Sequence, residues 1–188
     1  MPLVLTTPPA VSPVTVEQAR AHLRVDGAQE DALIASMIEA ATRRVEFETG
    51  QALITQHWSF YRDCWPRSGI LSIPLHPIQA VEEIRILTAA GLQTATAESY
   101  ETDLASRPAR IRALSGFPVP ARRMNVIEVR LRAGHGDAPA DVPAPLRQAI
   151  MIIVAHWFEH REGHDETIRA GLPAEARRII ESHREVRL

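Results

Sequence analysis

The residues with the clearest chemical potential are His156, Glu159 and His160, which fit the H-x-x-E-H pattern of one class of zinc peptidases. Two imidazoles four residues apart on a helix can bind one metal ion, and a glutamate between them can act as a general base. A third ligand would have to come from elsewhere, with His164, Glu175 and Glu181 as candidates. The pattern therefore defines one hypothesis, a zinc-dependent hydrolase.

The same motif has a plainer interpretation. It has three fixed positions in a chain with eight histidines, and Trp157 and Phe158 within it belong to an apolar helical stretch. Half-buried histidines at a helix-helix contact account for this pattern, and a short motif without structural context is often accidental. We therefore expect no catalytic residue, no bound metal and no cofactor, and keep the zinc hydrolase as the alternative.

Other reactive side chains lack the partners that catalysis needs. Cys64 is the only cysteine, so it can form no intrachain disulfide and no thiolate metal cluster, and it has no patterned histidine partner. Gly134-His135-Gly136 follows a predicted strand but lacks the spacing of a phosphate-binding loop, which favours a tight turn. An interaction protein is the remaining class.

The composition of the chain excludes further classes of protein. The chain has 188 residues, of which 45% are hydrophobic and 23% charged, as in an ordinary globular protein of one domain with or without an insertion. Its 21 basic residues, all arginine, face 23 acidic residues without a basic stripe, so we expect no binding driven by phosphate neutralisation. The longest apolar run, Ala149–Ala155, is far shorter than the roughly 20 residues of a membrane span. The proline-broken N-terminus does not resemble a signal peptide.

Two helices are expected near the N-terminus, after an extended, proline-punctuated arm over residues 1–14. Thr15 and Gln18 have the spacing of a capping box, which predicts a helix to about Arg24. Apolar residues at helical spacing predict a second helix over residues 30–49, with Gly50 just beyond its end.

Two further helices are expected near the C-terminus. After Pro143 and Pro145, an apolar stretch places Leu146, Ile150, Ile153 and Trp157 on one face of a largely buried helix that Gly163 ends. A last helix follows Pro173 and runs to about Val186. Its narrow apolar stripe comprises Leu172, Ala176, Ile179, Ile180 and Val186.

The middle of the chain has the texture of short strands and turns. Residues 125–132 alternate most clearly, so that their valine, isoleucine and leucine positions can form one half-buried face. Ala89-Ala90-Gly91 resembles a hairpin turn. The predicted strands lie at residues 54–61, 70–73, 81–87, 109–114 and 126–133.

This order predicts an α+β fold: a four-helix bundle built from N- and C-terminal helices, with an inserted β-rich lobe. The corresponding segments are residues 1–50, 51–140 and 141–188. Three segments would gain from docking on a partner: the N-terminal arm, the Pro118–Arg123 loop and the C-terminal helix. That helix fits either a partner's groove or the fourth place in its own bundle.

The chain resembles the head-tail connector (adaptor) family of tailed phages, which also occurs in gene transfer agents. The resemblance spans nearly the whole chain in the expected order. Its blocks are Val14–Asp26, Glu30–Ile34, residues 40–46, Thr49-Gly50, Pro74–Pro77 with Val81, Tyr100, Ala133–Gly136, Val142–Ala149, Ala155–Glu162 and Leu172-Pro173.

The resemblance implies a structural protein that is not an enzyme. Such proteins form a ring, typically of twelve copies, beneath the portal protein at one capsid vertex. They pass DNA through a central channel, without sequence-specific binding, toward a stopper and tail. The implied location is the head-tail neck of a virion or virus-like particle, after assembly in the bacterial cytoplasm. By position, portal binding falls on Glu175, Arg177, Arg178, Ile179, Ile180, Arg184 and Leu188.

The sequence departs from the family pattern at His160, where members commonly have another polar residue before the arginine at the Arg161 position. This departure accounts for the H-x-x-E-H pattern as a chance variant of a packing helix. Residues 51–136 are the most variable block, so the resemblance assigns them no role. An adaptor that binds a tail terminator instead of the portal fits the same residues.

Overall fold

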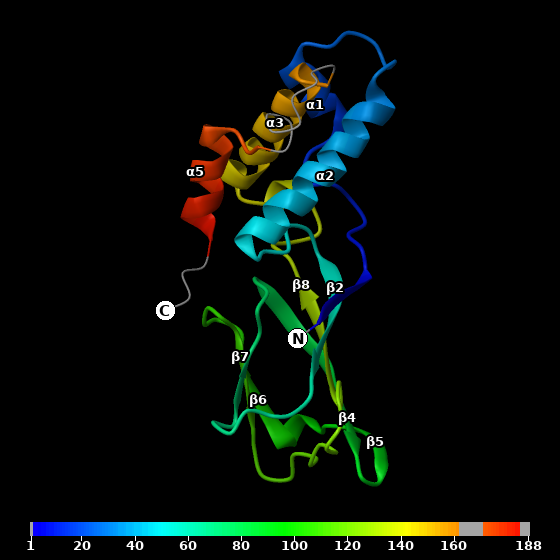
Figure 1. Cartoon of the computed structure of the whole chain (residues 1–188), viewed down its shortest axis with the longest axis vertical. Helices are drawn as coiled ribbons and strands as arrows, with labels where there is room; N and C mark the ends of the chain where they lie inside the picture. The colour runs from blue at the N-terminus through cyan, green and yellow to red at the C-terminus, as the bar shows by residue number, and fades with distance from the viewer. Residues whose placement is uncertain (1, 162–170, 185–188) are drawn as a thin grey trace. The chain divides into compact units, whose positions relative to one another are not determined.

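The computed structural model describes residues 2–161 and 171–184, which form four α-helices and two antiparallel sheets (Figure 1). The chain therefore has the mixed α+β class that the sequence predicts. Its residues divide into two compact units, one comprising residues 1–10 and 55–134 and the other residues 11–54 and 135–188. In the described residues no helix is long and apolar enough to cross a membrane.

The helical unit begins with α1 (Val16–Leu23) and α2 (Asp31–Thr49). The predicted capping box is present, because the Thr15 hydroxyl accepts a hydrogen bond from the Gln18 backbone and the Gln18 side chain accepts one from the Thr15 backbone. Helix α2 ends at Gly50, whose φ of 71° is the left-handed conformation that glycine adopts without strain. Both predicted N-terminal helices are confirmed.

The C-terminal helices are α3 (Ala144–Glu159) and α5 (Ala174–His183). The prediction that Gly163 ends the third helix does not hold, because α3 stops at Glu159 and the following His160 already leaves helical geometry. Gly163 itself lies outside the described residues, as does Val186 at the predicted end of the last helix. Leu146, Ile150 and Ile153 are fully buried, as their shared face predicts.

One apolar cluster is shared by all four helices. Figure 1 shows α3 lying between α2 and α5, and α3 contacts both of them as well as α1. Buried members come from both ends of the chain, among them Ala19 of α1, Ile34 and Ile38 of α2, Ile150 of α3 and Ile180 of α5. The helical unit therefore cannot form until residues more than a hundred positions apart meet.

The β-rich unit contains a five-stranded sheet in the order β1-β2-β8-β4-β5. Its central strands are β2 (Gln56–Arg62), β8 (Ile127–Ala133) and β4 (Ile78–Thr88), and its edges are β1 (Leu3–Thr7) and β5 (Gly91–Thr94). Strand β1 comes from the segment predicted as an extended arm. The predicted hairpin turn is present, with Thr88 paired to Gly91.

A three-stranded sheet in the order β3-β7-β6 completes this unit. Its strands are β3 (Ile70–Ser72), β7 (Arg110–Ala113) and β6 (Tyr100–Asp103). Apolar side chains of both sheets form buried cores, including Phe60 and Leu131 of the larger sheet and Leu71 and Ile111 of the smaller one. Short 3-10 helices occur at Ala97–Ser99 and Pro139–Asp141.

The helical core gives a direct stability prediction. Replacing Ile150, which is 0% exposed, with alanine removes three carbon atoms from a shared core and should lower the free energy of unfolding by about 2–5 kcal/mol. Replacing Phe47, which is 84% exposed on α2, with alanine should change it by less than about 0.5 kcal/mol. Urea unfolding, monitored by the circular dichroism signal of the helices, measures the change in the free energy of unfolding for both variants. Equal effects at the two positions would contradict this assignment of the core.

Candidate functional site

The H-x-x-E-H residues lie at the C-terminal end of α3. The rings of His156 and His160 are tilted, with centroids 4.4 Å apart, and Nδ1 of His160 donates a hydrogen bond to the carbonyl oxygen of His156 at 2.8 Å. That bond leaves only Nε2 of His160 as a ligand. Within the described residues, no group of three or more His, Cys, Asp or Glu side chains could hold a metal ion. Glu175 and Glu181 therefore do not complete the zinc set of the alternative hypothesis, and His164 lies outside the described residues.

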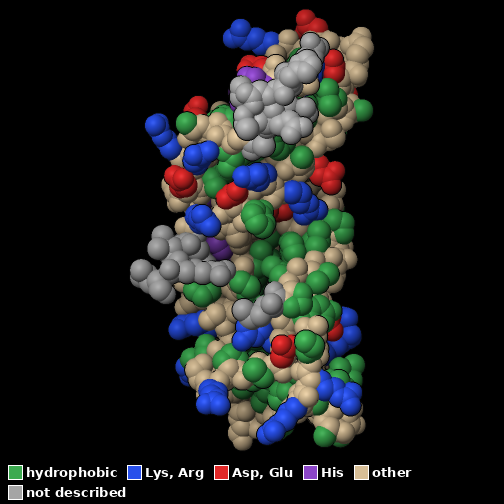
Figure 2. Space-filling view, in the orientation of Figure 1, with side chains coloured by type: hydrophobic (Ala, Val, Ile, Leu, Met, Phe, Trp, Pro, Cys, Tyr) green, Lys and Arg blue, Asp and Glu red, His purple; other side chains and the backbone are tan. Residues whose placement is uncertain are grey.

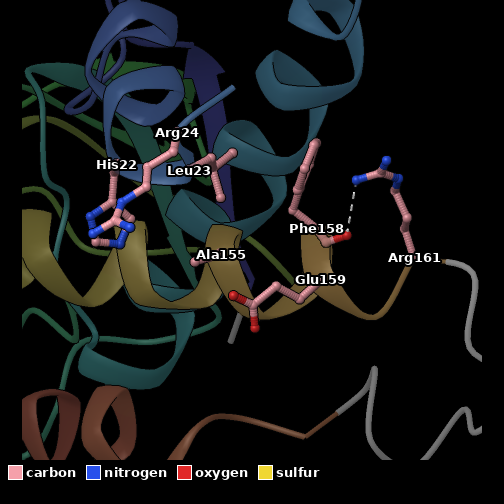
Figure 3. Close-up of a pocket in the computed structure, with 7 residues that line it drawn as sticks. All are labelled: His22, Leu23, Arg24, Ala155, Phe158, Glu159 and Arg161. Carbon is pink, nitrogen blue, oxygen red and sulfur yellow. Dashed lines mark hydrogen bonds between the residues drawn. The ribbon is translucent and has the colours of Figure 1, made fainter. Parts of the chain in front are cut away.

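A hollow of about 550 Å³ opens beside this end of α3 (Figure 3). His22, Leu23 and Arg24 line it from the end of α1, and Ala155, Phe158, Glu159 and Arg161 line it from α3 and the turn after it. The Arg161 guanidinium lies 4.0 Å from the centre of the Phe158 ring and donates to the Phe158 carbonyl oxygen at 3.3 Å. Among the described residues that line it, the hollow thus offers apolar and mixed charged surface, with Glu159 as the one carboxylate.

The described residues assigned to portal binding lie on α5 and at its C-cap, Arg184, and they divide into two groups. Glu175, Arg177, Arg178 and Arg184 are exposed. Ile180 is 3% exposed within the helical core, and Ile179 packs against that core. Ile180 is therefore closed to a partner, Ile179 is half-buried, and the exposed residues of this set are all charged. Leu188 lies outside the described residues.

The position of α5 is fixed by a buried glutamine. Gln51, 5% exposed, donates from Nε2 to the carbonyl oxygen of His183 at 2.8 Å, and its Oε1 lies 2.9 Å from Nε2 of His135. One side chain therefore joins the segment after α2, the segment before α3 and the last turn of α5. Of the two interpretations of the C-terminal helix, the structure supports a place in the helical core, with one charged face left exposed.

The outer face of the five-stranded sheet holds an ion network that the sequence interpretation missed. Arg85 and Arg130 contact Glu83 at 2.9 and 3.4 Å, and Arg130 also contacts Glu128 at 3.3 Å. The alternation of charged and apolar residues in β8 signals an exposed charged face. It does not tell which residues of β4 lie opposite, because β4 contains two register irregularities against β8.

Hydrogen bonding controls the charge state of this network. The bond from Arg85 lowers the pKa of Glu83. Partial burial acts to raise the pKa of Glu128, but hydrogen bonds from Ser59 and Arg130 outweigh it, so the pKa of Glu128 lies below its usual range. Both carboxylates are ionised at neutral pH and satisfied within the sheet, which makes this face a stabilising feature.

The loop of residues 114–125, which contains the predicted Pro118–Arg123 docking segment, is exposed and anchored. Val119 and Met124 are each 80% exposed. The Phe117 ring packs on Trp65 with centroids 4.5 Å apart, and the backbone N–H of Asn125 donates to Asp63 at 2.6 Å. These contacts hold the two ends of the loop against Asp63 and Trp65 and leave Val119 and Met124 exposed.

The helical unit thus has exposed charged side chains on α5, and the β-rich unit has exposed charged and apolar side chains on the 114–125 loop. The model of the head completion protein family matches residues 14–186, so the chain belongs to that family. No curated protein matches the sequence significantly.

Three solved structures are similar over all of this chain and 97% of theirs. The neck of an empty gene transfer agent particle, computed with C6 symmetry, contains a chain with a TM-score of 0.81 and 26% identity. The virion of a native gene transfer agent particle contains one with a TM-score of 0.80 and 26% identity. The neck of a native particle, computed with C12 symmetry, contains one with a TM-score of 0.78 and 27% identity.

The outer-face network gives a pH prediction. Because the folded-state pKa of Glu128 is lowered, its carboxylate adds stability above the ordinary pKa of glutamate, and this stability is lost as pH falls through the lowered value. Glu128→Gln should therefore destabilise the protein by about 1 kcal/mol at pH 7 and by much less at pH 3.

Urea midpoints of wild type and variant at the two pH values test this expectation. Glu98→Gln is the matched control, because Glu98 is an exposed glutamate that does not belong to the ion network on the sheet. A destabilisation by Glu128→Gln that is equal at both pH values would contradict the electrostatic origin.

Proposed function

We propose that this protein is a structural adaptor of a particle neck, which forms a ring beneath the portal and connects the head to the stopper and tail. The observation that carries the proposal is its end-to-end similarity to chains of gene transfer agent necks, combined with its family membership. The same similarity supports a location in the particle of a phage or gene transfer agent. The role is mechanical and does not include catalysis.

Twelve copies are the proposed number, supported by the C12 symmetry of one similar neck structure. A closed ring needs heterologous contacts between copies, in which two different patches of each chain meet. DNA would pass through the ring without sequence-specific contacts. The formal net charge of −2 is compatible with such a conduit, since a strongly basic channel would retain DNA.

In this proposal the four helices act as one bundle that presents the exposed face of α5 to the portal protein. The shared core and the Gln51 bonds support this role because they hold α5 in a fixed orientation. The portal-binding residues are then Glu175, Arg177, Arg178 and Arg184, with Ile179 and Ile180 securing the helix from beneath. The divisions at residues 1–50, 51–140 and 141–188 stay a prediction for how function is distributed along the chain.

The decisive experiment is native mass spectrometry of the protein, alone and mixed with the portal protein encoded near it. We expect one adaptor per portal subunit and no zinc mass on the free chain. Absence of a portal complex would overturn the proposal, and a stoichiometric zinc adduct would return attention to His156, Glu159 and His160.

Charge reversal on α5 tests the portal-binding residues. Arg177→Glu with Arg178→Glu should weaken portal binding about tenfold or more, equal to about 1.4 kcal/mol, because both side chains are exposed and the fold does not depend on them. Deleting residues 175–188 is a weaker test, because it also removes Ala176 and Ile180 from the core. Arg107→Glu, at an exposed position in the β-rich unit, is the control. Unchanged portal binding by the double variant would remove this site assignment.

A further inference from the structure

We propose that the tip of the 114–125 loop is a second docking surface, which binds a neck protein with an acidic and apolar face. The loop surface comprises Val119, Arg122, Arg123 and Met124. The inference rests on the proposed neck function and adds to it the place and chemistry of a contact other than the portal contact.

The composition of the loop surface is that of a protein interface. Val119 and Met124 are among the most exposed apolar side chains of the described residues, each at 80%. Methionine and arginine are enriched in protein interfaces, and methionine adapts its shape to a partner. Two apolar side chains beside two arginines fit a protein surface better than a DNA backbone, which offers phosphates and sugars but no apolar pocket.

The two arginines of the loop surface are available to bind a partner. Arg122 and Arg123 are exposed and form no ion pair within the part of the chain that the structure describes. Among the other described arginines of the same unit, Arg85, Arg110, Arg112 and Arg130 are paired with carboxylates, and Arg62, Arg67, Arg107 and Arg132 are not; only Arg122 and Arg123 are neighbours in the chain and lie next to an exposed methionine. The two loop arginines therefore attract acidic groups from outside the chain, without first breaking an internal contact.

The two units also differ in net charge. Residues 1–10 and 55–134 contain ten arginines and seven acidic residues, whereas the remaining residues contain eleven and sixteen. On the face shown in Figure 2, arginine side chains outnumber acidic ones over the β-rich unit. This separation of charge favours different partners for the two units, and an acidic partner for the basic one.

The loop is held in place before any partner arrives. Phe117 packs on Trp65, the Asn125 backbone donates to Asp63, and the Ala121 backbone donates to the Leu87 carbonyl oxygen at 2.8 Å. A loop fixed at three points loses little conformational entropy on binding, which favours affinity. The anchoring residues are separate from the four residues that project.

The reactivity of Cys64 can report whether this surface is covered. Cys64 is the only cysteine of the chain, is exposed, and follows Asp63, the residue that binds the Asn125 backbone. In purified particles, N-ethylmaleimide should modify Cys64 about tenfold more slowly than in the free protein, since a bound partner leaves only a small free fraction. The control is a Cys64→Ser variant that also carries Arg107→Cys. Its thiol at position 107 should react with N-ethylmaleimide at similar rates in particles and in the free protein.

A benzophenone-maleimide attached to Cys64 identifies what covers the surface. A photo-cross-link to a neck protein other than the portal and other than this chain is the expected result. Arg122→Glu with Arg123→Glu should abolish that cross-link and leave portal binding unchanged. The variant Arg177→Glu with Arg178→Glu should instead weaken portal binding.

The remaining outcomes overturn the inference in distinguishable ways. Equal labelling of Cys64 in free protein and particles would show an uncovered surface, and a cross-link to DNA or to a second copy would show the wrong class of partner. In each case the protein is still present in the particle, so the proposed function survives. Absence of the protein from purified particles would instead contradict the proposed function itself.

Discussion

The burial of α3 is the constraint on which the rest of the helical unit depends. This helix is apolar around most of its circumference, and its buried residues Leu146, Ile150 and Ile153 are covered by helices from both ends of the chain. Neither end can bury its own apolar face alone, because α1 and α2 together lack the partner that α3 provides. The unit therefore folds as one body although its sequence is split by eighty residues of β structure.

That constraint explains how function and stability are divided along α5. Its apolar side, with Ala176 and Ile180, is committed to the core, and Gln51 binds the carbonyl oxygen of His183 near its end. The charged side is left exposed by the same packing. A helix that is fixed on one face and charged on the other is suited to recognition, because little order remains to be gained when a partner binds.

Arginine residues have two different roles in the β-rich unit. On the outer face of the large sheet, Arg85 and Arg130 are held between Glu83 and Glu128, where they stabilise strand pairing. On the 114–125 loop, Arg122 and Arg123 stand beside exposed apolar side chains. Sequence charge alone does not distinguish these roles, because pairing depends on which residues the strand register places opposite one another.

The sequence by itself determined the features that depend on local chemistry. The Thr15–Gln18 capping box, the left-handed Gly50 and the alternation in β8 each predicted an element that the structure contains. Strands β1, β5 and β6 were missed for one physical reason: all three lie at sheet edges and are largely exposed, so they have little apolar alternation. Only the tertiary structure decided that Ile179 and Ile180 face the core, that the Gln51 side chain joins three segments, and which arginines are paired. Those outcomes depend on contacts between residues distant in the chain, which local periodicity does not encode.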